Sequence, residues 1–146
     1  MNRVCAQEHY DLLIREGNDP VLEIGVGTGR LALKVLAAGC RRFTGIDLSP
    51  LTAERAREHL KEFKNALILC GDFLSNEFCE SYDILYCSLT LFHFQNKAAF
   101  VENAESLLRP GGRLVVSIPR KKRISWIWAT GSSTCTRTTP ALSVRC

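Results

Sequence analysis

The sequence predicts an α/β domain built on a doubly wound parallel sheet. Three observations support this fold class: short aliphatic runs alternate with amphipathic segments, a glycine-rich turn directly follows the first aliphatic run, and 146 residues suit a single domain. Each crossover between parallel strands must pack back onto the sheet in a right-handed sense, so helices are expected on both faces. Ligands of such sheets bind at the carboxyl ends of the strands. Residues at strand ends are therefore the candidates for function.

The first elements follow one another closely. Residues 3–16 carry apolar side chains at roughly helical spacing and predict an N-terminal helix, which would cap the core as residues 1–19. The next run, PVLEIG, is aliphatic and too short for a helix, as is typical of a buried parallel strand. Residues Thr28–Ala38 then predict a helix, because Leu31 and Val35 fall on one face.

The same alternation continues through the body of the chain. RRFTGID predicts a second strand that ends at Asp47, and Ser49 with Pro50 predicts a helix start, because serine caps helices and proline is tolerated at the first helical position. The later elements are, in order, a strand in ALILCGD, a strand in YDILYCSL, a helix over 96–108 and a strand in RLVVSIP. Five strands are thus predicted within one domain, residues 20–119.

The end of the chain differs in composition from the body. Residues 119–146 hold six basic residues and no acidic one, so residues 1–118 carry 13 basic against 15 acidic residues. This Ser/Thr-rich segment shows no clear period, so no sixth or seventh strand is predicted, and residues 120–146 are expected to be a disordered or aberrant tail. Two alternatives are a basic arm at Arg120–Arg123 that binds nucleic acid or an acidic surface, and coverage of the edge of the fifth strand by ISWIW.

Cysteine usage and hydropathy predict a cytoplasmic protein. The seven cysteines are odd in number and form no C-x-x-C pair, which argues against a disulfide framework and against a metal site. Cys70 and Cys87 lie in aliphatic runs and are expected to be small buried side chains, with a nucleophilic Cys87 as the alternative. No apolar run approaches the roughly 20 residues of a membrane span, and no signal peptide is expected.

Three glycines follow the first strand at alternate positions. Gly25, Gly27 and Gly29 give G-x-G-x-G, whereas the dinucleotide-binding spacing is G-x-G-x-x-G. Such glycines permit a sharp turn and leave backbone N–H groups open to a ligand at the start of the next helix. A tight turn without a ligand is the alternative. A nucleotide-dependent oxidoreductase is disfavoured by the spacing.

Three acidic residues stand at the ends of the first three strands. Glu23 lies inside the first strand, where a carboxyl group is costly without donors or a nearby cation. Asp47 ends the second strand, where a carboxylate can accept hydrogen bonds from both ribose hydroxyls. Asp72 closes the third strand. Three acids suit a ligand with a positive group and a ribose better than they suit a pyrophosphate.

At this point the chain resembles the class I S-adenosylmethionine-dependent methyltransferases. VLEIGVGTG is similar to the first motif of that family, GIDLSP to the second, CGDF to the third, YDILYCSLTLFHF to the fourth and LLRPGGRLVVSIP to the fifth. The resemblance covers roughly residues 20–119. It implies a Rossmann-like fold, S-adenosylmethionine as cofactor and methyl transfer as the reaction.

The resemblance also implies a set of cofactor-binding residues. The turn Gly25-Val26-Gly27 would lie against the amino-acid part of the cofactor, and Glu23 would order that turn. Asp47 would hold the ribose hydroxyls, and Leu48 would pack on the adenine. The other implied residues are Asp72 and Phe73 at the adenine amine and ring, and Ser88 near the methionyl part.

The acceptor side is expected just beyond the fourth strand. His93 is the candidate general base, and the alternative is a histidine that only packs between Phe92 and Phe94. The fourth motif lacks the N-P-P-Y type of sequence that the family uses on nucleobase or glutamine nitrogens, and no basic face lies within the core. A small-molecule acceptor is therefore predicted, with nucleic acid disfavoured. The competing hypothesis is a cofactor-binding but catalytically incomplete fragment, or a non-catalytic interaction domain.

Overall fold

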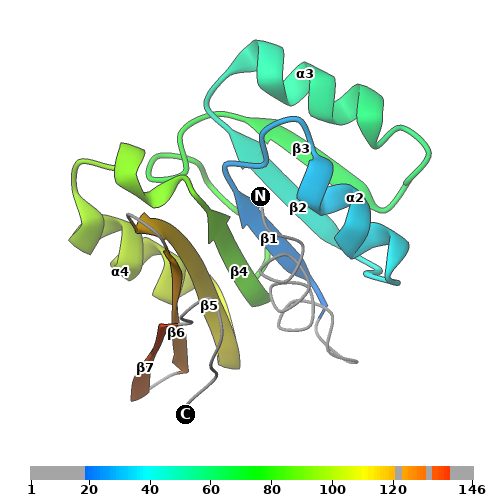
Figure 1. The fold of residues 1–146 in the computed structure, drawn as a ribbon. Coiled ribbons are helices and arrows are strands. Elements are labelled where there is room, and N and C mark those ends of the chain that lie inside the picture. Colours follow the sequence, from blue (N-terminus) through cyan, green and yellow to red (C-terminus); the bar gives the residue numbers. More distant parts are fainter. Residues whose placement is uncertain (1–18, 121–122, 131–132, 139–146) are drawn as a thin grey trace.

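One sheet forms the centre of the structure (Figure 1). The computed structural model describes residues 19–120, 123–130 and 133–138. Within them the strands lie in the order β3-β2-β1-β4-β5-β6-β7. Their bounds are β1 Val21–Ile24, β2 Phe43–Asp47, β3 Ala66–Cys70, β4 Tyr82–Ser88, β5 Leu108–Arg120, β6 Arg123–Thr130 and β7 Ser133–Thr138. The helix predicted over residues 3–16 falls outside the described residues.

The first five strands confirm the predicted fold class. β1 pairs in parallel with both β2 and β4, β2 with β3, and β4 with β5. The chain therefore runs outward from β1 to the edge at β3 and then returns to the other side of β1 at β4. The strand order reverses between β1 and β4, which is where such a sheet opens a ligand crevice.

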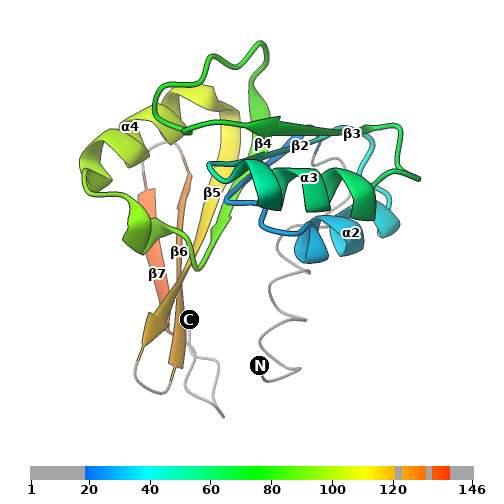
Figure 2. The ribbon, with the colours of Figure 1, turned by 90° about the horizontal axis from the view of Figure 1, so that it is seen from above.

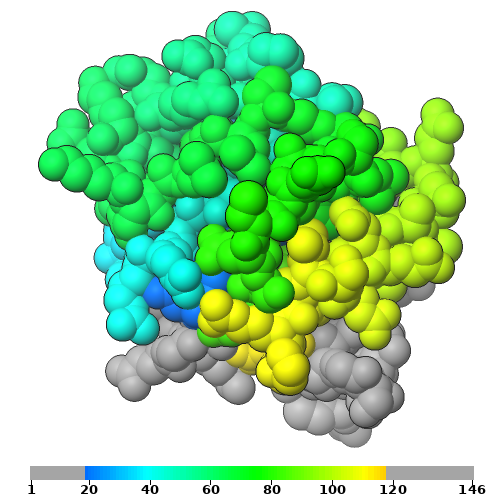
Figure 3. Space-filling view, turned by 180° about the vertical axis from the view of Figure 1, so that it is seen from behind, coloured from blue at the N-terminus to red at the C-terminus, as the bar shows by residue number. Residues whose placement is uncertain are grey.

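Helices cover both faces of these strands (Figure 2). Helix α2 (Arg30–Ala37) and helix α3 (Pro50–His59) lie on one face, and helix α4 (Lys97–Leu107) lies on the other. Side chains alternate between the two cores along β4: Ile84 and Tyr86 face α2 and α3, whereas Leu85 and Cys87 face α4. In the space-filling view only a small blue area of the β1 region remains visible (Figure 3).

The helix starts match their sequence signals. The Ser49 side chain accepts a hydrogen bond from the Thr52 N–H, and Pro50 occupies the first helical position of α3. The Asn96 side chain caps α4 through the Ala99 N–H. These side-chain caps set where α3 and α4 begin. They thereby help to keep the segments after β2 and β4 at the edge of the sheet.

The end of the chain departs from the prediction. No strand was expected after residue 119, yet the backbone of β6 pairs antiparallel with β5, and β7 pairs antiparallel with β6. β6 contains ISWIW, so the pairing agrees with the alternative in which this segment covers the edge of the fifth strand. Ile, Trp and Thr all favour strands, and a segment rich in them can pair without a marked polar alternation. In the register of this pairing the backbone of Arg120 is opposite that of Arg123.

Candidate functional site

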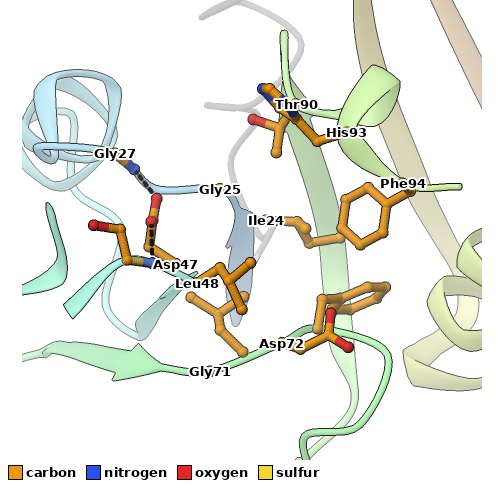
Figure 4. Close-up of a pocket in the computed structure, with 13 residues that line it drawn as sticks. Ile24, Gly25, Gly27, Asp47, Leu48, Gly71, Asp72, Thr90, His93 and Phe94 are labelled. Carbon is orange, nitrogen blue, oxygen red and sulfur yellow. Dashed lines mark hydrogen bonds between the residues drawn. The ribbon is translucent and has the colours of Figure 1, made fainter.

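A cavity of about 700 Å³ opens at the carboxyl ends of the parallel strands (Figure 4). Four chain segments line it: the end of β1 with its glycine turn, the end of β2, the end of β3, and the segment after β4. Its position at the β1/β4 reversal is the one that the topology predicts. Its volume falls within the roughly 300–1,000 Å³ of small-molecule sites.

The glycine turn needs its glycines for two different reasons. Gly25 has a φ of +76°, and a Cβ there would lie 2.4 Å from the Thr90 Oγ1. Gly27 has a φ of +57°, and a Cβ there would meet no atom within 4 Å. The first glycine therefore permits close packing against the segment after β4. The second leaves an open cradle beside the cavity that a side chain would fill.

The Asp47 carboxylate is fixed at the cavity by two backbone donors. Its Oδ2 accepts a hydrogen bond from the Gly27 N–H at 2.9 Å, and its Oδ1 accepts one from the Ser49 N–H at 3.0 Å (Figure 4). Each oxygen keeps a further lone pair for a ligand hydroxyl. Next to it, the Leu48 side chain lines the cavity and is 73% exposed, so it offers an apolar surface that a flat ring can cover.

Glu23 lies beneath this surface and does not line the cavity. It is buried, and its Oε2 accepts a hydrogen bond from the Tyr86 hydroxyl at 2.6 Å. Burial raises the pKa of Glu23 to about 8; the Tyr86 hydrogen bond opposes that rise, and the Asp47 charge adds to it. At neutral pH the side chain is therefore largely protonated, which explains how an acid is tolerated inside the strand.

The raised pKa of Glu23 predicts a stability that falls with pH. The folded protein holds this proton up to a pKa of about 8, whereas the unfolded chain releases it near the ordinary glutamate pKa of 4.5. The contribution is fully present below pH 4.5 and is lost as the pH rises toward 8, with a slope of up to about 1.4 kcal/mol per pH unit. Glu23→Gln keeps an acceptor for Tyr86 and should remove this part of the slope. Urea unfolding between pH 5 and 8 measures it, and equal slopes in both proteins would refute the assignment.

Asp72 and Phe73 line the cavity from the end of β3. The Asp72 side chain is exposed, and its Oδ1 accepts a hydrogen bond from the Leu74 N–H at 3.3 Å, which shapes the turn after the strand. Phe73 is buried, and its ring packs on Phe94 and Phe100 with centroid distances of 6.2 and 5.4 Å. Asp72 thus presents charge to the cavity, and Phe73 supports its apolar floor.

Two further residues of the predicted set, Val26 and Ser88, do not line the cavity, as Glu23 does not. The Val26 side chain is buried in the core beneath α2 and α3, and its N–H donates to the Ile46 carbonyl oxygen at 3.1 Å. The Ser88 carbonyl oxygen accepts from the Thr90 hydroxyl, and its own Oγ accepts from Ser117. Neither residue is among those that line the cavity. Their roles in cofactor binding remain predictions.

His93 lines the cavity at the end of the short 3-10 helix η1 (Leu91–His93). Its ring is exposed and lies 4.1 Å from the Phe92 ring, centroid to centroid. Phe94 instead packs into the core against Phe73 and Phe100. The histidine ring therefore contacts one phenylalanine ring at a tilt of 42° rather than lying enclosed between two, and it lines the cavity.

Sequence reasoning missed Thr90, which lines the cavity and packs directly against Gly25. Its position just past a strand end was the available signal, but the contact with the glycine turn depends on the pairing of β1 with β4. Figure 4 shows Thr90 and His93 on the opposite side of the cavity from Asp72. The cavity thus has an acidic and apolar side from β2 and β3, and a second side from the segment after β4.

Of the two cysteines predicted to be buried, Cys87 is buried and Cys70 is not. Cys87 is buried as predicted, and burial raises its pKa to about 12, which is opposite to what a nucleophilic thiol requires. Cys70 is exposed rather than buried, because β3 is the edge strand and leaves its end uncovered.

No helix among the described residues is long and apolar enough to cross a membrane.

Comparison with known proteins identifies similar chains. The family model described as a methyltransferase domain matches residues 22–116. The demethylmenaquinone methyltransferase of Tropheryma whipplei is 35% identical over 108 residues, which cover 70% of this chain and 44% of that protein. An uncharacterized methyltransferase of Bacillus licheniformis is 38% identical over 107 residues, covering 71% of this chain and 46% of that protein. The chain spans about half the length of the curated relatives that it matches.

A solved structure shares the architecture. The N-methyltransferase NodS from Bradyrhizobium japonicum, in complex with S-adenosyl-L-homocysteine, superimposes with a TM-score of 0.66 at 25% identity. The match covers 76% of this chain and 60% of that chain.

Proposed function

Because the chain belongs to the methyltransferase domain family over residues 22–116, we propose that it binds S-adenosylmethionine in this cavity and transfers the methyl group to a small-molecule acceptor. The observation that carries the proposal is the Asp47 carboxylate, which the Gly27 and Ser49 N–H groups hold at the cavity next to the open glycine turn. A ligand with a ribose and a positive charge matches this arrangement.

The residues present fit this cofactor. The open space at Gly27 leaves room beside the turn for the amino-acid part, and Asp47 keeps lone pairs for the ribose hydroxyls. Leu48 offers an exposed apolar side chain to the adenine, and Asp72 lies on the same side as an acceptor for its amine. When bound, S-adenosylmethionine supplies a methyl group on a positively charged sulfur.

The chain itself contributes alignment and charge rather than acid catalysis. Asp47 and Asp72 give the cavity a negative potential that favours a cation, whereas Glu23 adds little charge at neutral pH because burial keeps its pKa at about 8. Phe94 and Ile24 add apolar lining that excludes water from the reacting groups. His93 lines the cavity, and we propose it as the group that takes a proton from an acceptor that must lose one.

The second candidate function is that of a cofactor-binding domain that does not complete the transfer reaction. The matched part of the chain contains the cofactor cavity, and the match covers about half of each relative. Both candidates share the cofactor site and differ at the acceptor. Methyl transfer to a panel of small acceptors, measured with radiolabelled cofactor, separates them.

We also propose the domain organisation, location and partners of the protein. Residues 20–119 form the cofactor-binding domain and residues 1–19 its cap. A cytoplasmic location suits the free cysteines among the described residues. Nucleic acid is a poor partner for a cavity that Asp47 and Asp72 line.

Calorimetric titration tests the cofactor assignment. S-adenosylhomocysteine should bind the wild-type chain with a dissociation constant in the micromolar range, and NAD should not bind measurably, because the turn lacks the dinucleotide spacing. His93→Ala should leave the affinity for S-adenosylhomocysteine within about twofold while it lowers transfer, since His93 is assigned to the acceptor. Binding of neither ligand, or preference for NAD, would exclude the proposal.

A further inference from the structure

The cavity wall after β4 begins with a strained leucine. Leu89 has a φ of +57°, a left-handed conformation in which the Cβ of an L-residue crowds the backbone. Thr90 follows it directly and His93 and Phe94 come shortly after, and all three line the cavity. Backbone strain of this kind persists only where the surroundings hold it.

Ser117 on the neighbouring strand β5 supplies that hold. It is 1% exposed, and its Oγ accepts a hydrogen bond from the Leu89 N–H at 3.1 Å. Its carbonyl oxygen accepts from the same N–H, also at 3.1 Å. The Ser117 hydroxyl in turn donates to the Ser88 Oγ at 3.2 Å. One buried side chain therefore binds both residues at the point where β4 ends.

Further hydrogen bonds connect this point to the residues that line the cavity. The Thr90 hydroxyl donates to the Ser88 carbonyl oxygen at 3.0 Å, and the His93 N–H donates to the Thr90 carbonyl oxygen at 3.0 Å. Thr90 also fills the space in front of Gly25, where an added Cβ would lie 2.4 Å from its Oγ1. A shift of Leu89 would therefore move both Thr90 and His93 relative to the glycine turn.

We propose that Ser117 is a positioning residue: its hydroxyl holds Leu89 in the left-handed conformation and thereby sets Thr90 and His93 against the cavity. Ser117 itself is not among the residues that line the cavity. The effect on cofactor binding rests on the function proposed above. The hydrogen bond between Ser117 and Leu89 is present in the protein without ligand.

Hydrogen exchange and calorimetry on the full chain test this role with Ser117→Ala. The amides of residues 89–91 should exchange at least about tenfold faster, while the amides of β1 stay within about threefold. The variant loses the hydroxyl's hydrogen bonds to Leu89 and Ser88, and only the Ser117 carbonyl oxygen still accepts from the strained Leu89. The affinity for S-adenosylhomocysteine should fall about fivefold. Thr44→Ala is the matched control: its hydroxyl is also buried and bonds the Tyr82 hydroxyl, but it lies on β2. It should change neither readout.

Each outcome decides the proposal. The proposal is overturned if Ser117→Ala leaves exchange at residues 89–91 unchanged, or if exchange rises equally throughout the sheet. It is also overturned if wild-type protein binds S-adenosylhomocysteine and Ser117→Ala binds it with the same affinity. If wild-type protein does not bind S-adenosylhomocysteine, the proposed function fails, and the exchange data alone decide whether Ser117 holds the segment. If Ser117→Ala does not fold, Ser117→Cys carries the same comparison, because it nearly keeps the volume and weakens the acceptor.

Discussion

Asp47→Ala should weaken binding of S-adenosylhomocysteine by about 100-fold or more. Two hydrogen bonds from ligand hydroxyls to a carboxylate would be lost, each worth roughly 1.5–3 kcal/mol, and about 2.7 kcal/mol corresponds to a factor of 100. The same change leaves the Gly27 and Ser49 N–H groups without their carboxylate partner, which loosens the glycine turn. Titration calorimetry measures the affinity.

Two control variants separate ligand contacts from general charge effects. Asp47→Asn keeps one oxygen acceptor and should lose less affinity than Asp47→Ala. Glu54→Ala removes an exposed acid that pairs with Arg57 on α3, outside the cavity, and should leave the affinity within about twofold. Equal losses in Asp47→Ala and Glu54→Ala would mean that Asp47 does not contact the ligand.

Gly25→Ala should destabilise the fold by about 2–4 kcal/mol and abolish ligand binding. The added Cβ would lie 2.4 to 2.8 Å from three side-chain atoms of Thr90, which gives overpacking in addition to the strain of a positive φ. The methyl group would also push the segment after β4 away from the glycine turn. Urea unfolding and calorimetry measure the two effects.

Gly111→Ala is the matched control for backbone strain. Gly111 has a φ of +78°, close to the +76° of Gly25, but an added Cβ would meet no atom within 4 Å. It should cost about 1–2 kcal/mol, from strain alone. In Gly25→Ala, the further change Thr90→Gly removes all three clashing atoms and should bring the stability loss nearer to that of Gly111→Ala. Similar losses in the two single variants would show that contact with Thr90 is unimportant.

The glycine turn and Asp47 could be predicted from sequence because both depend on local order. A parallel strand that ends in glycine or aspartate puts that residue at the carboxyl edge whatever its neighbours are. Thr90 and Ser117 could not be predicted, since their roles arise from contacts with Gly25 and Leu89, far away in the chain. Those contacts require the pairing of β1 with β4 and of β4 with β5.

Two differences from the prediction have the same origin. Cys70 sits in an aliphatic run, and only the strand order shows that this run forms the exposed edge of the sheet. β6 and β7 have no marked alternation of apolar and polar residues, and their pairing with β5 depends on an edge that the sequence does not display. Composition predicts which segments favour strands, but neighbours in the sheet decide which of them pair.

The reversal of strand order between β1 and β4 also constrains how the protein folds. β1, β2 and β3 can pair before the rest of the sheet is in place, and they already contain the glycine turn and Asp47. The wall that carries Thr90 arrives only with β4, about 60 residues after β1, and closing a loop of that length is a slow, non-local event. A partly folded chain would therefore hold half of the cavity, and a ligand that needs both sides would bind and stabilise only the fully assembled parallel sheet.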